Sequence, residues 1–124
     1  MARGQSLYHE YPGYQVALEQ SSGHIRVKCR GTLVADSRRT LTVRETQHEP
    51  VVYFPIEDVR FEHLEKTDLE TFCPFKGEAS YWSIRTGSGL EENVVWRYEE
   101  PFDEVAPLSG YVSFYPDRVD WERS

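Results

Sequence analysis

Short runs of β-branched and aromatic residues, each bounded by turn-forming residues, dominate this sequence, whereas stretches with helical periodicity are scarce. The clearest run covers residues 24–30, in which Ile25, Val27 and Cys29 alternate with charged side chains. A period of two places these three side chains on one face of a strand. The sequence therefore predicts a mainly β fold of two antiparallel sheets, with one or two short helical turns.

Several further runs share this pattern. We expect strands within residues 24–30, 33–36, 41–45, 51–54, 79–85, 93–98 and 110–115. The first three follow one another through short turns, which predicts a meander. Residues 79–85 and 93–98 flank the turn Gly87-Ser88-Gly89 and predict a hairpin. Residues 56–60 and 101–107 are expected to form a helical turn at most, and residues 71–77 a structured loop.

The length of 124 residues suits a single domain with an adequate core, and no linker or repeat divides it. We expect one domain over 1–124, with residues 1–15 partly extended or flexible. The net charge of −7 comes without a basic stripe, which argues against nucleic-acid binding. No apolar run is long enough to span a membrane or serve as a signal sequence. These features predict a cytoplasmic monomer or homodimer.

Two cysteines without a CxxC motif fit a reducing compartment, although a Cys29–Cys73 disulfide remains an alternative. Cys73 opens the segment Cys73-Pro74-Phe75-Lys76-Gly77, the strongest candidate site. A thiol three residues from an ammonium is a candidate nucleophile, and Lys76 is also a candidate cation for a carboxylate or phosphate. The alternative is structural: Cys73 is a small buried apolar residue, and Pro74 and Gly77 shape a bend.

Aromatic residues make up 14% of the chain and supply candidate walls for a cleft. The candidate ligand-binding residues are Cys73, Lys76, Tyr81, Trp96, Tyr98, Tyr53 and Tyr115. Tyr81 and Trp82 point to opposite faces of a strand, so one of them at most lines a given cleft, whereas Trp96 and Tyr98 share a face. Such a wall suits a planar or cationic ligand, but packing in a β core accounts for the same residues.

Metal and hydrolase motifs are missing from the sequence. His9, His24, His48 and His63 lie far apart without metal-ligand spacing, which predicts solvated surface histidines and no metal or cofactor. No GxSxG motif supports a catalytic triad. Whether the chain is an enzyme stays open at this point, with Cys73 as the candidate catalytic residue.

An ordered set of motifs carries a resemblance to a known family. It runs through Val34-Ala35-Asp36-Ser37, Tyr53-Phe54-Pro55, the CPFKG segment from Cys73, Ala79-Ser80-Tyr81-Trp82, Trp96-Arg97-Tyr98 and Gly110-Tyr111-Val112. Over about residues 24–120 the chain resembles the bacterial domain of unknown function 427 family, also labelled nucleotidyltransferase 9. The resemblance implies a β-tent-like fold, in which two antiparallel sheets lean together and leave an aromatic-lined cleft.

The nucleotidyltransferase label implies a magnesium site built from closely spaced carboxylates, together with a loop that holds phosphates. The aspartates Asp36, Asp58, Asp103, Asp117 and Asp120 lie far apart in sequence, and no glycine-rich phosphate loop is present. Zinc, which some β-tent proteins hold on two CxxC pairs, has no such ligands here. We therefore expect a small-molecule-binding domain, with a Cys73 thiolate enzyme or a protein-interaction module as alternatives.

Overall fold

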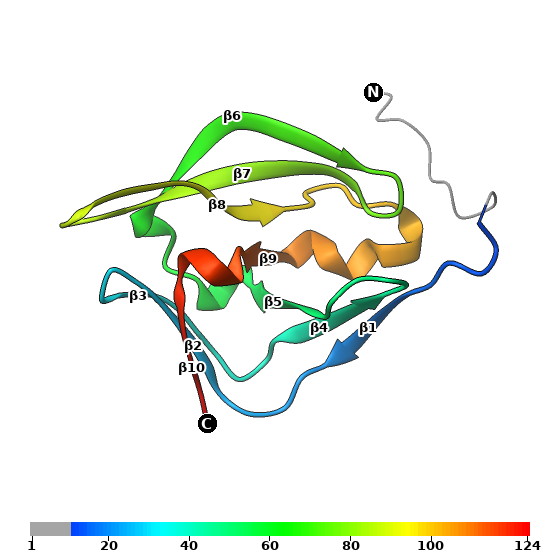
Figure 1. The fold of residues 1–124 in the computed structure, drawn as a ribbon, viewed down its shortest axis with the longest axis horizontal. Helices are drawn as coiled ribbons and strands as arrows, with labels where there is room; N and C mark the ends of the chain where they lie inside the picture. Colours follow the sequence, from blue (N-terminus) through cyan, green and yellow to red (C-terminus); the bar gives the residue numbers. More distant parts are fainter. Residues whose placement is uncertain (1–10) are drawn as a thin grey trace.

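The computed structural model describes residues 11–124, which form ten β-strands in two antiparallel sheets (Figure 1). The strands are β1 (Val16–Gln20), β2 (Ile25–Cys29), β3 (Thr32–Ser37), β4 (Leu41–Glu45), β5 (Val51–Pro55), β6 (Leu64–Cys73), β7 (Gly77–Thr86), β8 (Gly89–Arg97), β9 (Tyr111–Phe114) and β10 (Asp120–Arg123). The larger sheet has the order β1-β4-β5-β9-β8-β7-β6, and the smaller has the order β10-β2-β3. The predicted mainly β fold of two antiparallel sheets is thus confirmed.

The predicted hairpin is confirmed, because β7 pairs with β8 from Ser80 opposite Arg97 to Thr86 opposite Gly89. The predicted meander is wrong. β2 and β3 pair as expected, but the chain then leaves the smaller sheet, and β4 pairs with β1 and β5 in the larger one. Leu41 and Val43 of β4 are buried in a different core from Ile25 of β2, so a continuous three-stranded sheet would separate β4 from its apolar partners.

The segment 71–77 is mostly strand rather than the expected loop. β6 runs to Cys73 and β7 begins at Gly77, so only Pro74–Lys76 form the turn between them. Most side chains of β6 are exposed. Its charged residues, such as Glu65, Lys66 and Glu70, interrupt the alternation of apolar residues by which a strand is recognised in a sequence. An edge strand rich in charge resists pairing with other chains, which fits the position of β6 at one end of the sheet.

In the described part of the chain, four short 3₁₀ segments connect the strands: η2 (Ile56–Asp58), η3 (Phe61–His63), η4 (Asp103–Gly110) and η5 (Pro116–Arg118). The first agrees with the expected turn at 56–60. η4 is longer than the expected turn at 101–107 and buries Val105 and Leu108 against the larger sheet. Within residues 11–124, none of these helical segments has the length and apolar character needed to cross a membrane.

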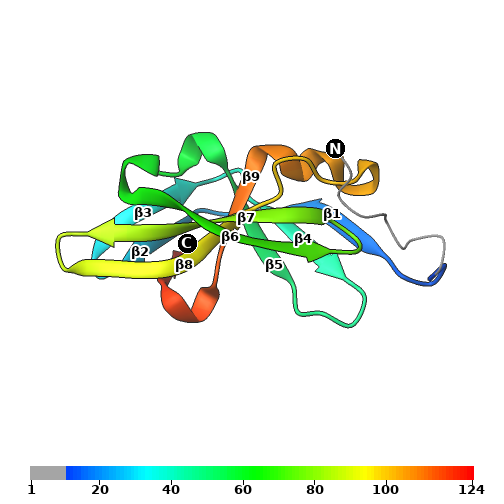
Figure 2. The ribbon, with the colours of Figure 1, turned by 90° about the horizontal axis from the view of Figure 1, so that it is seen from above.

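The larger sheet carries a separate apolar core on each face. Neighbouring residues of β5 show the division: Phe54 belongs to the core beneath the smaller sheet, whereas Tyr53 belongs to the second core with η4. In Figure 1 the β6–β8 part of the larger sheet lies above β4 and β1, and the smaller sheet lies at the lower left. Figure 2 shows β6, β7 and β8 running along the length of the domain. The second core is the one that borders the candidate site.

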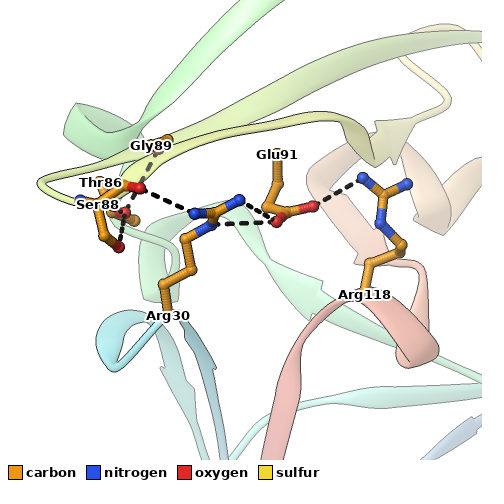
Figure 3. Close-up of polar contacts among 6 residues, drawn as sticks. All are labelled: Arg30, Thr86, Ser88, Gly89, Glu91 and Arg118. Atoms are coloured by element: carbon orange, nitrogen blue, oxygen red, sulfur yellow. Dashed lines mark hydrogen bonds and ion pairs between the residues drawn. The ribbon is translucent and has the colours of Figure 1, made fainter.

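A charged cluster joins the two sheets at the far end of the β7–β8 hairpin (Figure 3). Glu91 of β8 accepts hydrogen bonds from Arg30, which follows β2, at 2.7 and 3.1 Å, and from Arg118 of η5 at 2.8 Å. Arg30 also donates to the carbonyl oxygen of Ser88 at 2.8 Å. These hydrogen bonds hold the pKa of Glu91 below its usual value, so folding favours its ionised form.

Replacing Glu91 with glutamine is expected to lower the free energy of unfolding at neutral pH. The variant's stability is also expected to fall less steeply than that of the wild type as the pH is lowered. Because the folded-state pKa of Glu91 is depressed, its contribution is complete above the unfolded value near 4.5 and is lost as the pH falls further. Urea titrations of wild type and Glu91→Gln between pH 7 and pH 3 measure this. A constant difference in unfolding free energy across that range would contradict it.

Candidate functional site

A cavity of about 590 Å³ opens beside the second core of the larger sheet. Aromatic residues are the largest group in its lining, beside a few aliphatic and a few charged or polar residues: Tyr14, Val43, Glu45, His48, Glu49, Val51, Tyr53, Cys73, Pro74, Phe75, Lys76, Tyr81, Trp96, Tyr98 and Tyr115. The volume is in the range of small-molecule sites, and such sites combine apolar walls with a few polar groups. This cavity is therefore the candidate functional site.

All the candidate ligand-binding residues from the sequence line this one cavity: Cys73, Lys76, Tyr81, Trp96, Tyr98, Tyr53 and Tyr115. Strand alternation explains which aromatic residues face it. Tyr81 lies on the cavity side of β7, whereas its neighbour Trp82 packs into the core on the opposite face. Trp96 and Tyr98 share the cavity side, as expected from their spacing. The structure brings the residues together, and their binding role stays a prediction.

The turn between β6 and β7 places Cys73 and Lys76 at the polar end of the cavity. The backbone N–H of Lys76 donates to the carbonyl oxygen of Cys73 at 3.2 Å, and Phe102 N–H donates to the carbonyl oxygen of Lys76 at 3.0 Å. Gly77 has a φ of +118°, and a Cβ there would lie 3.4 Å from the carbonyl oxygen of Glu100. This position needs glycine because L-residues rarely adopt that conformation, so the glycine fixes the direction in which Lys76 enters the cavity.

Lys76 forms a buried ion pair with Glu45 at the end of β4. Their side chains are only 9% and 10% exposed. Burial alone would raise the pKa of Glu45, but hydrogen bonds from Lys76 and Tyr14 together lower it, which keeps the carboxylate ionised. Tyr14, which precedes β1, also stacks on Phe75 with ring centroids 3.7 Å apart, so this segment covers one side of the turn.

Glu45 and Tyr14 were not predicted from the sequence as parts of the site, and Phe75 was expected there only as a member of the segment that begins at Cys73. In the sequence, Glu45 was recognised only as a further alternating residue of its strand, and it lies 31 positions from Lys76. Nothing in the local pattern indicates that the end of β4 meets the β6–β7 turn, because that contact depends on the pairing of nonadjacent strands. Cys73 and Lys76 do lie at a turn, as the expected loop at 71–77 implied, although the turn is shorter than that loop.

The phenols in the cavity wall differ in their hydrogen bonding. Tyr81 interacts with Thr71, whose hydroxyl lies 2.9 Å from its phenol oxygen. Burial and a hydrogen bond with Tyr81 raise the pKa of Tyr115 to about 12. Trp96 Nε1–H donates to the phenol oxygen of Tyr53 at 3.2 Å, and Trp96 lies 4.7 Å from Tyr115 between ring centroids. These contacts fix the orientation of the aromatic wall.

The two cysteines are free thiols in different surroundings. Cys73 is partly exposed at the cavity, with its sulfur 3.7 Å from Lys76 Nζ. Cys29 is buried between the sheets, and that burial, followed by the charge of Glu91, raises its pKa. Because the two cysteines lie in different parts of the fold, only Cys73 can take part in chemistry at the cavity.

The three histidines of the described residues, His24, His48 and His63, have different surroundings. His24 is partly buried and contacts Asp36, so the expectation that it lies on the solvated surface is wrong; Asp36 on the neighbouring strand β3 provides the partner. His48 is exposed beside the cavity, and His9 lies outside the described residues. Between residues 11 and 124, no three His, Cys, Asp or Glu side chains come together as a group suited to a metal ion.

Comparison with known proteins gives a family and no assigned activity. A search of the curated proteins found no match. The model of the family described as "Domain of unknown function (DUF427)", labelled NTP_transf_9, matches residues 17–124. That stretch contains both sheets apart from Val16, the first residue of β1, and every lining residue of the cavity except Tyr14. On this match, the chain belongs to the DUF427 family.

Proposed function

We propose that this domain binds a small molecule in the aromatic cavity. The observation that carries the proposal is the combination of about 590 Å³ of space, walls from six strands or their ends, and a buried Lys76–Glu45 ion pair at one end. Aromatic rings supply large apolar contact areas. The charged pair and the phenols supply the few polar groups that orient a ligand.

The alternative that the aromatic residues serve only as core packing is weaker for this set. Phe54 and Phe114 show what core packing looks like, because both are fully buried and their rings meet edge to face at 5.5 Å. Trp96 and Tyr115, in contrast, retain accessible surface beside the cavity. No side chain of residues 11–124 fills this space, which supports a role for it in binding.

A screen of neutral, cationic and anionic aromatic fragments by ligand-observed NMR tests the proposal. We expect ligands that change tryptophan fluorescence in the wild type and bind several-fold more weakly to Trp96→Phe, because the indole contributes contact area and stacking. Trp82→Phe is the matched control, since Trp82 lies in the core on the opposite face of the sheet. Fragments that bind both variants equally, or a screen without any binder, would overturn the proposal.

A second candidate function is thiol chemistry at Cys73, favoured by the 3.7 Å contact between its sulfur and Lys76 Nζ. An ammonium at this distance stabilises a thiolate, the reactive form of cysteine. The carboxylate of Glu45 competes for the same ammonium, which weakens that effect. The candidate therefore ranks behind simple binding.

Iodoacetamide labelling followed by intact mass and peptide mapping distinguishes the two thiols. We expect Cys73 to react in the native protein, and Cys29 to react only on unfolding, because Cys29 is buried and burial raises its pKa. An enzyme that uses Cys73 requires the native thiol to react faster than the same thiol in urea-unfolded protein. A slower native rate would leave the binding proposal intact and exclude an activated nucleophile.

A further inference from the structure

Two buried phenols in the cavity wall carry hydrogen-bonding capacity that no group within residues 11–124 uses. Tyr98 is 7% exposed, and its hydroxyl has no hydrogen-bond partner within residues 11–124. Tyr53 is 2% exposed; its oxygen accepts from Trp96 Nε1–H, and no group in the described part of the chain accepts its own proton. Buried polar groups are nearly always paired, so two unused phenols beside one cavity point to a partner outside the protein.

The Tyr98 hydroxyl is accessible from the cavity. Within residues 11–124, Thr40 Oγ1 is the one fully inaccessible side-chain oxygen or nitrogen atom in a non-exposed residue that lacks a hydrogen bond. The Tyr98 oxygen, also without a hydrogen bond, therefore retains accessible surface. Since Tyr98 lines the cavity and is otherwise buried, that surface belongs to the cavity.

Both phenols act as donors rather than as anions. Burial raises the pKa of Tyr98 and of Tyr53, and the nearby Glu45 adds to both shifts. Tyr53 raises the pKa of Tyr98 further, whereas the hydrogen bond from Trp96 offsets part of the rise at Tyr53. The protons therefore stay in place at neutral pH. Because the Tyr53 oxygen already accepts from Trp96, its remaining capacity lies mainly in its O–H.

The charges around the cavity are already balanced at its polar end. Lys76 is paired with Glu45, so neither an anionic nor a cationic ligand meets an uncompensated buried charge there. The other lining residues with ionisable side chains of this kind, His48 and Glu49, are exposed. A neutral ligand avoids the cost of removing an ion from water without a partner.

Building on the proposed function, we infer that the ligand is a neutral aromatic ring molecule with a carbonyl-type oxygen that accepts hydrogen bonds from Tyr98 and Tyr53. The aromatic wall contacts the rings, and the two phenols orient the carbonyl. A hydrocarbon of the same shape fills the same space but leaves both phenols unpaired. A site built to donate hydrogen bonds discriminates strongly against such an analogue.

Four probes on one ring system test the inference: 1-indanone, indane, indan-1-ylammonium and indane-1-carboxylate. Each is titrated into the wild type, Tyr98→Phe and Tyr111→Phe, with dissociation constants from ligand-observed NMR. We expect 1-indanone to bind the wild type roughly tenfold more tightly than indane, and Tyr98→Phe to remove most of that difference. Tyr111→Phe, a phenol outside the cavity, is expected to preserve it.

The outcomes separate this inference from the proposed function. If indane, the ammonium or the carboxylate binds as tightly as 1-indanone at a site sensitive to Trp96→Phe, the cavity binds ligands but the carbonyl preference is wrong. If the preference for 1-indanone survives Tyr98→Phe, the phenol does not supply it and the inference is overturned. If no probe binds, both the inference and the proposed function are contradicted.

Discussion

Replacing Phe54 with alanine is expected to destabilise the domain by about 3–5 kcal/mol. Phe54 is fully buried between the sheets, where its ring meets Phe114 edge to face at 5.5 Å and Trp121 at 5.7 Å. Removing the ring deletes apolar burial and leaves a cavity that rigid β-strands on both sides close only partly. A domain of this size has a total stability of roughly 5–15 kcal/mol, so this single change removes a large share.

Urea unfolding followed by circular dichroism measures the loss. Phe72→Ala is the matched control, because Phe72 lies on the edge strand β6, is 45% exposed, and contacts Phe102 only edge to face at 6.0 Å. We expect the control to change the unfolding free energy by less than about 1 kcal/mol. Similar losses for the two phenylalanines would show that the region between the sheets is not the principal core.

The central strands could be predicted from sequence because their burial follows simple alternation. Ile25, Val27 and Cys29 are all buried, as the pattern of β2 indicated. The hairpin β7–β8 was likewise visible, since its two apolar strands flank a short glycine turn. In these segments local preference and tertiary environment agree, and local analysis therefore suffices.

Of the four edge strands among residues 11–124, β3 was expected at residues 33–36, but the other three could not be predicted in the same way. β1, β6 and β10 contain no fully buried residue, so they lack the alternation of buried and exposed side chains that marks a strand packed on a core. Their backbone hydrogen bonds to β4, β7 and β2 define them instead. The order of the strands depends on the same long-range pairing, which explains the mistaken meander at β3 and β4.

The aromatic wall of the candidate site could be predicted from the sequence, but Glu45, the ion-pair partner of Lys76, could not. Trp96 and Tyr98 were placed on one face because a strand has a period of two, and the structure agrees. The pairing of Lys76 with Glu45 joins the β6–β7 turn to the end of β4. No rule of local spacing connects those segments, so the sequence indicated a cation available for ligands where the fold holds an ion pair.

Breaking the Lys76–Glu45 ion pair is expected to cause the second large loss of stability. Lys76→Met is expected to cost about 2–4 kcal/mol at neutral pH, because it leaves the buried carboxylate of Glu45 without its ammonium. The upper end of the range for buried pairs does not apply, since both groups line an open cavity and retain contact with water. Tyr14 still donates a hydrogen bond to Glu45 in this variant, which further reduces the expected loss of stability.

The double variant Lys76→Met, Glu45→Gln serves as the control. It removes both charges, so we expect it to recover at least half of the stability lost in the single variant. Urea unfolding of the wild type, both single variants and the double variant gives the coupling between the two residues. Equal stability of Lys76→Met and the double variant would contradict a buried, unpaired carboxylate as the cause.

The dependence on pH gives an independent test of the same cause. In the wild type the pKa of Glu45 is lowered, so the contribution of the pair is present above the usual value of 4.5 and is lost as the pH falls further. In Lys76→Met, burial acts without the ammonium and raises the pKa of Glu45, so protonation at mildly acidic pH relieves the unpaired charge. The stability gap between wild type and Lys76→Met is therefore expected to narrow steadily from pH 7 to pH 4. A gap that stays constant over this range would mean that the lysine contributes through the packing of its alkyl chain, and the polar end of the cavity would then have to be assigned to the phenols alone.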